Sequence, residues 1–108
     1  MAVPDDDLQQ IRRWAAGKTP PEFAATMRIE VDIAGPIVTI IDYRPEDDPP
    51  WNQQEVARLR WTAKYGTWSL YWIDRNSRWH LYDRVPPTAR ISTHLNEIDA
   101  DPTCIFWG

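Results

Sequence analysis

The sequence is poor in the residues that bind metals or form disulfides. Cys104 is the only cysteine in 108 residues, and there are two histidines. One thiol excludes a disulfide within the chain, and one Cys with two His cannot complete the four-ligand cage of a structural zinc ion. We therefore expect no metal site, no cofactor and a reducing, cytoplasmic environment.

Glycine is also scarce, and long apolar runs are missing. The four glycines stand far apart at positions 17, 35, 66 and 108, which excludes the usual glycine-rich nucleotide-binding loops. No apolar run approaches the roughly 20 residues that span a bilayer, and the acidic start of the chain is unlike a secretory signal. These features predict a soluble protein without a membrane partner.

Tryptophan, in contrast, is abundant, with seven residues beside four tyrosines. Each large ring can bury roughly 150–250 Å², so a short chain can still assemble a substantial core. Hydrophobic residues make up 43% and charged residues 26%, a balance typical of globular proteins. The length predicts a single domain over 1–108.

The residue patterns predict two helices and a sheet. Asp5 is suited to cap a helix over 5–16, and Thr88 to cap a second helix that ends near Asp99. Alternating apolar and charged residues predict a strand at 27–33, and a β-branched run predicts another at 37–43. The fold class is therefore α+β: an antiparallel meander sheet of about five strands with an N-terminal and a C-terminal helix.

Turn lengths predict the register of the next three strands, because each added loop residue changes which side chains share a face. A two-residue turn at Tyr65 and Gly66 brings the bulky apolar residues of the first hairpin together on one face. The predicted pairs are Ala63 with Trp68, Trp61 with Leu70, and Leu59 with Trp72.

The second hairpin has two possible registers. A two-residue turn at Asn76 and Ser77 pairs Trp72 with Leu81 and places Trp79 on the apolar face. The alternative is a three-residue loop in which Asp74 pairs with Arg78, and it would turn His80 and Tyr82 toward the core. We expect the two-residue turn.

In this register the opposite face combines cations with aromatic rings: Arg58, Arg60, Tyr71, His80 and Tyr82. Basic side chains neutralise phosphates, and aromatic rings stack on unpaired bases. Residues 51–90 carry seven basic and three acidic side chains, although the net charge of the chain is -4. The alternative is an ordinary solvated face with arginine stems lying across tyrosine rings. We expect a non-enzymatic binding module whose partner is a protein or a single-stranded nucleic acid.

Two further hypotheses compete with this one. The first is a ligand-binding or enzymatic pocket around His80, with Asp74 or Asp83 as an orienting carboxylate. Ser69 would lie on the same face as His80, but no nucleophile motif surrounds this serine, so no catalytic residue is assigned.

The second competing hypothesis is a structural or oligomer-forming role. It comes from the apolar end of the chain, with Ile105, Phe106 and Trp107. Such a segment is too apolar to remain in water, so we expect it to dock on the core or on a second copy of the chain.

Four segments also carry a family resemblance: 68–72 (WSLYW), 78–82 (RWHLY), 97–102 (EIDADP) and 106–108 (FWG). Together they resemble a bacterial family of small proteins known as domain of unknown function 3024. The resemblance covers 56–108 and implies a bacterial source, but no activity, ligand or catalytic residue. Similar chains often carry glycine near the position of Cys104, which argues against a role for this thiol.

Overall fold

A computed structural model describes residues 3–18, 22, 28–44 and 52–107, with Asn52 described by its backbone alone. These residues form an α+β structure in which a five-stranded antiparallel sheet follows the chain order, so the predicted fold class is confirmed. In chain order the elements are α1 (Asp5–Gly17), β1 (Arg28–Ala34), β2 (Ile37–Arg44), β3 (Asn52–Thr62), β4 (Thr67–Ile73), β5 (Trp79–Leu81) and α2 (Ile91–Ala100).

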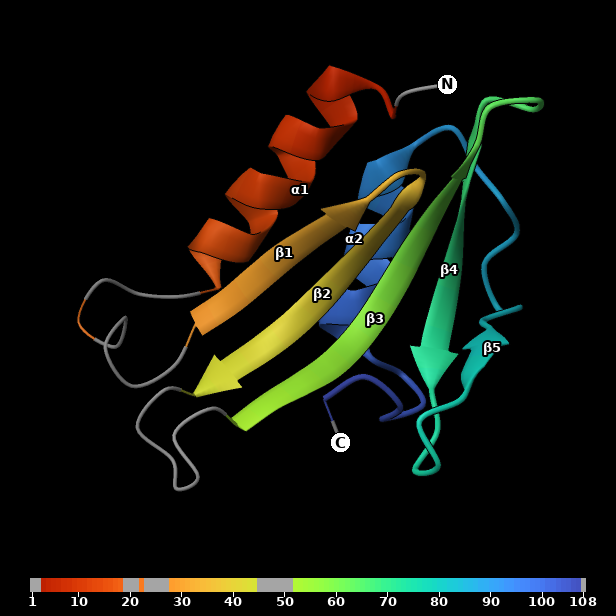
Figure 1. Ribbon diagram of the computed structural model, residues 1–108. Coiled ribbons are helices and arrows are strands. Elements are labelled where there is room, and N and C mark those ends of the chain that lie inside the picture. The colour runs from red at the N-terminus through yellow and green to blue at the C-terminus, as the bar shows by residue number, and fades with distance from the viewer. Residues whose placement is uncertain (1–2, 19–21, 23–27, 45–51, 108) are drawn as a thin grey trace.

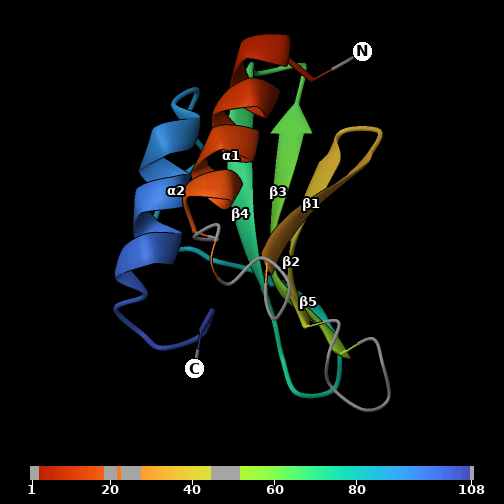
Figure 2. The ribbon, with the colours of Figure 1, turned by 90° about the vertical axis from the view of Figure 1, so that its left-hand side faces the viewer.

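Both helices lie on the same side of the sheet (Figures 1 and 2). The core lies between these two layers, and Trp68 of β4 is fully buried there. Its indole N–H donates to Asp7 of α1 at 2.8 Å, and its backbone carbonyl lies 2.8 Å from Nε2 of His94 on α2. Trp68 therefore joins both helices to the sheet. None of the helices in the described residues is long and apolar enough to span a membrane.

The helix starts differ from the prediction. The N-cap of α1 is Pro4, without a side-chain capping bond, so Asp5 begins the helix rather than capping it. Its carboxylate still lies in the first turn, where negative charge favours the helix dipole. The N-cap of α2 is Arg90, and Thr88 instead accepts a bond from the Arg90 N–H at 3.1 Å. Thr88 lies before the helix, where its backbone forms an isolated antiparallel bridge with Trp68 of β4.

The β3–β4 hairpin, called the first hairpin here because its register was predicted first, has a four-residue loop, so the predicted two-residue turn is wrong. Thr62 pairs with Thr67, which leaves residues 63–66 in the loop. The N–H groups of Tyr65 and Gly66 both donate to the Thr62 carbonyl, at 3.2 and 2.9 Å. Gly66 has φ +63°, a conformation that glycine adopts without steric cost. The register moves by two residues, which leaves every side chain on its predicted face.

The β4–β5 hairpin, called the second hairpin, has the three-residue loop, so the predicted two-residue turn is wrong here as well. The Asp74 N–H donates to the Arg78 carbonyl at 2.9 Å. The Asp74 carboxylate accepts the N–H groups of Asn76 at 2.8 Å and Arg78 at 3.0 Å. Ser77 takes the left-handed position with φ +63°. A type I turn followed by a left-handed residue is a common three-residue hairpin loop.

This one-residue difference exchanges the faces of β5. Tyr71 pairs with Leu81, Trp72 with His80 and Ile73 with Trp79. His80 therefore shares the helix side of the sheet with Trp72, whereas Trp79 and Leu81 lie on the opposite side. The prediction that Trp79 joins the core and that His80 accompanies Tyr71 is wrong.

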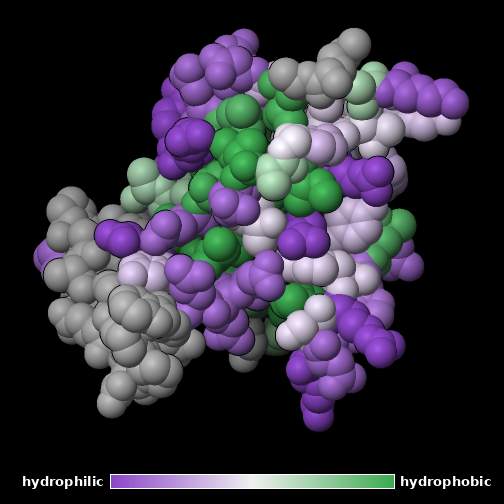
Figure 3. Space-filling model, viewed as in Figure 1, coloured by the Kyte–Doolittle hydropathy of each residue, from purple (hydrophilic) through white to green (hydrophobic). Residues whose placement is uncertain are grey.

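The side of the sheet opposite the helices is called the open face below. Within the described residues neither helix covers it, and Figure 1 shows it toward the viewer. Figure 3, from the same side, shows hydrophilic and hydrophobic residues interleaved over this surface rather than one apolar patch. A ligand of the predicted sheet site would therefore bind on the open face.

Candidate functional site

The open face brings together three of the five predicted binding residues. Arg58 and Arg60 come from β3, and Tyr71 pairs with Arg58 from β4. With Ile37 of β2 and Trp79 of β5, these three line a cavity of about 140 Å³. Four neighbouring strands thus contribute to one shallow cationic and aromatic site.

Arg58 is fixed in place by three contacts. Its Nε–H donates to the hydroxyl of Thr39 at 3.2 Å, and its Nη2 lies 3.5 Å from the carboxylate of Glu55. The guanidinium carbon lies 4.2 Å from the centroid of the Trp79 ring, within the range of a cation–π contact. The arginine therefore covers one part of the indole and holds its own charge at the surface.

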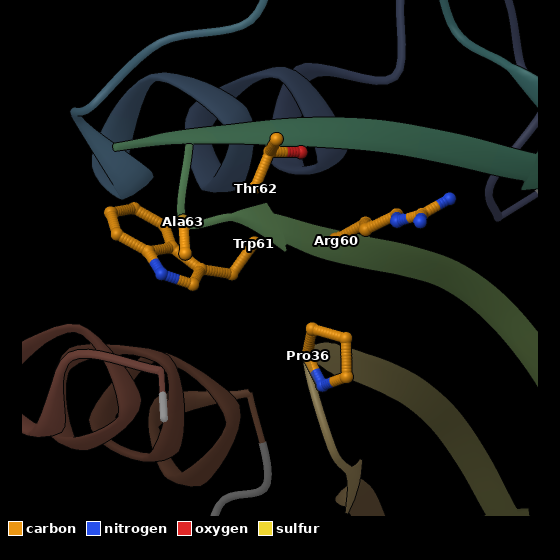
Figure 4. A pocket seen from close by; sticks show the side chains of 5 residues that line it. All are labelled: Pro36, Arg60, Trp61, Thr62 and Ala63. Atoms are coloured by element: carbon orange, nitrogen blue, oxygen red, sulfur yellow. The ribbon is translucent and has the colours of Figure 1, made fainter. Parts of the chain in front are cut away.

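Arg60 is the less constrained cation of the site. Its side chain is exposed and forms no ion pair within the part of the chain that the structure describes. Arg60 also lines a second cavity of about 290 Å³ with Pro36, Trp61, Thr62 and Ala63 (Figure 4). Arg60 therefore lines both cavities, and its charge is not neutralised by an ion pair with any described residue.

Charge is distributed unevenly across the open face. On the β1 side, Arg28 is paired with Glu30 at 3.0 Å and Asp32 is exposed. On the β3 side, Arg58 is likewise paired with Glu55, but Arg60 on the same face is exposed and has no ion pair among the described residues. An anionic ligand is therefore attracted toward β3, β4 and β5 and repelled from the β1 edge.

His80 lies on the other side of the sheet. Its ring stacks on Trp72 with a centroid distance of 4.6 Å and an interplanar angle of 27°. Its Nε2 is 2.7 Å from the carboxylate of Asp74, one of the two carboxylates named in the enzymatic hypothesis. The pKa of Asp74 is lowered, first by its bond with His80 and then by the N–H of Arg78.

Tyr82 is buried in the core, with 3% of its surface exposed. Its hydroxyl donates to the carboxylate of Glu97 at 2.6 Å, and its ring packs on Phe106 at 5.1 Å. Burial, followed by the neighbouring carboxylate, raises the pKa of the Tyr82 phenol. Tyr82 therefore belongs to the packing between β5, α2 and the end of the chain, and it is unable to contact a ligand on the open face.

Trp79 is the site residue that sequence reasoning missed. The signal was Asp74, because an aspartate at the first position of a type I turn bonds the backbone N–H groups that follow it. Reading Asp74 as the start of the loop gives three loop residues and turns Trp79 outward. The corrected aromatic pair of the open face is therefore Tyr71 with Trp79.

The corrected register also separates the residues of the enzymatic hypothesis. Ser69 pairs with Arg60 and lies on the open face, whereas His80 lies on the helix side. His80 is exposed and lies flat on Trp72. Among the described residues, no three His, Cys, Asp or Glu side chains come together as a metal site.

The apolar end of the chain docks on the core. Phe106 is buried, Ile105 is half-buried, and the indole of Trp107 donates to the Ile98 carbonyl at 2.8 Å. Cys104 is exposed, with φ +58°. The first of the two predicted places for this segment is thus observed, and a role in oligomerisation stays a prediction.

The sequence as a whole matches the family described as Domain of unknown function (DUF3024) over residues 2–108. The chain belongs to this family. The match extends the predicted resemblance, which covered 56–108, to α1 and the first strands of the sheet. Neither the curated proteins nor the solved structures include a match to the chain.

Proposed function

We propose that this DUF3024 chain is a non-enzymatic binding module that binds single-stranded nucleic acid on its open face. The observation that carries the proposal is the Arg58 guanidinium over the Trp79 ring at 4.2 Å, with Tyr71 and Arg60 lining the same cavity. Cations and aromatic rings at this spacing suit a ligand that alternates phosphates with planar bases.

The geometry favours unpaired over paired nucleic acid. The cavity lined by Tyr71 and Trp79 is small, about 140 Å³, and all of its lining residues lie on strands of the sheet. A base can reach such rings only when it is not stacked inside a duplex. In this proposal Arg60, which lines both cavities, contacts the phosphate next to that base.

Binding is measured by the fluorescence anisotropy of labelled oligo(dT) and oligo(U) over a range of salt concentrations. We expect affinity to fall as salt rises, with a logarithmic slope of about -0.7 for each phosphate contact. Arg60→Gln should reduce that slope by about one contact. Trp79→Leu should weaken binding roughly 5- to 150-fold, the value of one stacked base at about 1–3 kcal/mol.

Arg13→Gln is the matched control, because Arg13 is an exposed arginine on α1, in the layer behind the sheet. It should leave the affinity and the slope unchanged. Absence of binding, or equal losses in Arg13→Gln and Arg60→Gln, would contradict the proposal. Binding of a protein that does not weaken with salt would identify the open face as a protein-binding surface instead.

A further inference from the structure

On the helix side of the molecule, the Lys18 ammonium group lies between two indole rings. Its nitrogen is 5.6 Å from the centroid of the Trp14 ring and 5.9 Å from that of Trp107. The same nitrogen forms an ion pair with the carboxylate of Asp99. Two indoles and one carboxylate therefore surround a cation, and Trp14, Trp107 and Asp99 are called the indole cage below.

Both rings of the indole cage are held by contacts that do not involve Lys18. The Trp14 indole N–H is 3.1 Å from each carboxylate oxygen of Asp99. The Trp107 indole donates to the Ile98 carbonyl at 2.8 Å, and its backbone N–H donates to Asp101 at 2.9 Å. The walls should therefore keep their arrangement when the lysine side chain leaves.

Lys18 itself is held loosely. Both ring distances are close to the outer limit of about 6 Å for a cation–π contact. The side chain remains 32% exposed, and that of Asp99 37% exposed, so solvent screens their ion pair and its contribution is small. An external cation can thus compete with Lys18 at a low energetic cost.

A cavity next to the cage provides the space for such a cation. It has a volume of about 270 Å³ and is lined by Lys18, Ile29, Asp99 and Trp107. This is below the roughly 300–1,000 Å³ of pockets that hold drug-sized ligands, so it suits a small group. Aromatic rings with a carboxylate are the chemistry that recognises quaternary and methylated ammonium ions.

We propose that the indole cage is a binding site for a methylated or quaternary ammonium group, and that Lys18 occupies it as a ligand from the same chain until such a cation arrives. A quaternary ammonium needs no hydrogen-bond partner, so it loses less than a primary ammonium on leaving water for a site with one carboxylate. The site lies on the helix side, so it is independent of binding at the open face.

The test is a titration of the full chain with tetramethylammonium chloride, followed by the Trp14 and Trp107 indole N–H signals in NMR spectra. Sodium chloride at equal concentration corrects for ionic strength. We expect saturable shifts of these two signals. Lys18→Met should lower the dissociation constant several-fold by removing the competitor, and Asp99→Asn should raise it roughly fivefold, the value of one exposed charge pair.

Asp32→Asn, which removes an exposed carboxylate from the open face, is the control and should bind as the unmodified chain does. Trp107→Leu is a second variant in case Asp99→Asn does not fold, and it should also weaken binding. The proposal is overturned if the unmodified chain shows no saturable shift, if Lys18→Met binds no more tightly, or if Asp32→Asn weakens binding as Asp99→Asn does.

Two further probes distinguish the sources of the ligand. Choline represents a free quaternary amine, and a peptide containing trimethyllysine represents a modified protein. Both should shift the two indole signals, because they share the trimethylammonium group. Tighter binding of the peptide would assign the site to a protein partner, and equal binding would assign it to a small molecule. Failure of both probes would overturn the proposal.

Discussion

The β3–β4 hairpin and the β4–β5 hairpin are closed in different ways. The loop between β3 and β4 is closed by backbone bonds to the Thr62 carbonyl and by Gly66 in the left-handed conformation. The loop between β4 and β5 is closed by the Asp74 side chain and has Ser77 in the left-handed position. A two-residue error in the first loop preserves the faces of the sheet, whereas a one-residue error in the second exchanges them. Loop parity therefore decides the composition of the open face.

The largest expected effect on stability comes from truncating Tyr82, and its neighbour Leu81, on the opposite face of the sheet, provides the comparison. Tyr82→Ala should destabilise the fold by about 3–5 kcal/mol, as aromatic truncation in a core does, because Tyr82 is 3% exposed. Leu81→Ala should change stability by less than about 0.5 kcal/mol, because Leu81 is 53% exposed on the open face. Urea unfolding measures both. The two-residue turn would give the opposite ranking.

Much of the fold could be predicted from the sequence because it rests on local patterns. Alternation over 27–33, β-branched residues over 37–43 and helical spacing after Thr88 place the elements within a few residues of their observed ends. The helix caps were less predictable, because Pro4 and Arg90 precede the helices without a side-chain bond. Asp5 and Thr88 fit the usual preference for a cap, but the chain uses them otherwise.

The candidate site could be predicted only in part. Arg58, Arg60 and Tyr71 were placed correctly on one face, because a two-residue shift of the β3–β4 register leaves every side chain on the same face. His80 and Trp79 exchanged faces, because loops of two and three residues both fit the sequence around Asn76. The choice between the two loop lengths depends on the hydrogen bonds of one carboxylate, that of Asp74. A pattern of apolar residues contains no information about these bonds. The indole cage joins residues from α1, α2 and the end of the chain, which no local spacing connects.

A smaller effect on stability is expected from substitutions at Gly66 and Ser77, the left-handed positions of these two loops. Gly66→Ala should cost about 1 kcal/mol, because a side chain at φ +63° is strained, although the new Cβ would have an ordinary 3.9 Å contact with Trp61. Ser77→Gly should have the opposite sign and stabilise by about 0.5 kcal/mol. Thermal unfolding of both variants checks the comparison. Two changes of the same sign would mean that the second loop does not hold Ser77 in this conformation.

The smallest expected effect is local and appears in acid. The pKa of Asp74 is lowered by its bonds with His80, Arg78 and Asn76, from an ordinary value of 3.8. A carboxyl whose pKa is lower in the folded state contributes stability above its unfolded value, and loses it as the pH falls through the folded value. Below pH 3.8 the second hairpin should therefore loosen before the first, whose loop residues 63–66 include no acid.

The indole N–H signals of Trp79 and Trp61 report on the two hairpins separately in NMR spectra recorded at decreasing pH. Trp79 should shift first, because β5 follows the Asp74 loop directly, whereas Trp61 should keep its folded position. Asp74→Asn should abolish the early shift of Trp79, since an amide does not titrate. If both signals move together in both proteins, acid unfolds the whole sheet and the Asp74 carboxylate does not govern the second loop by itself.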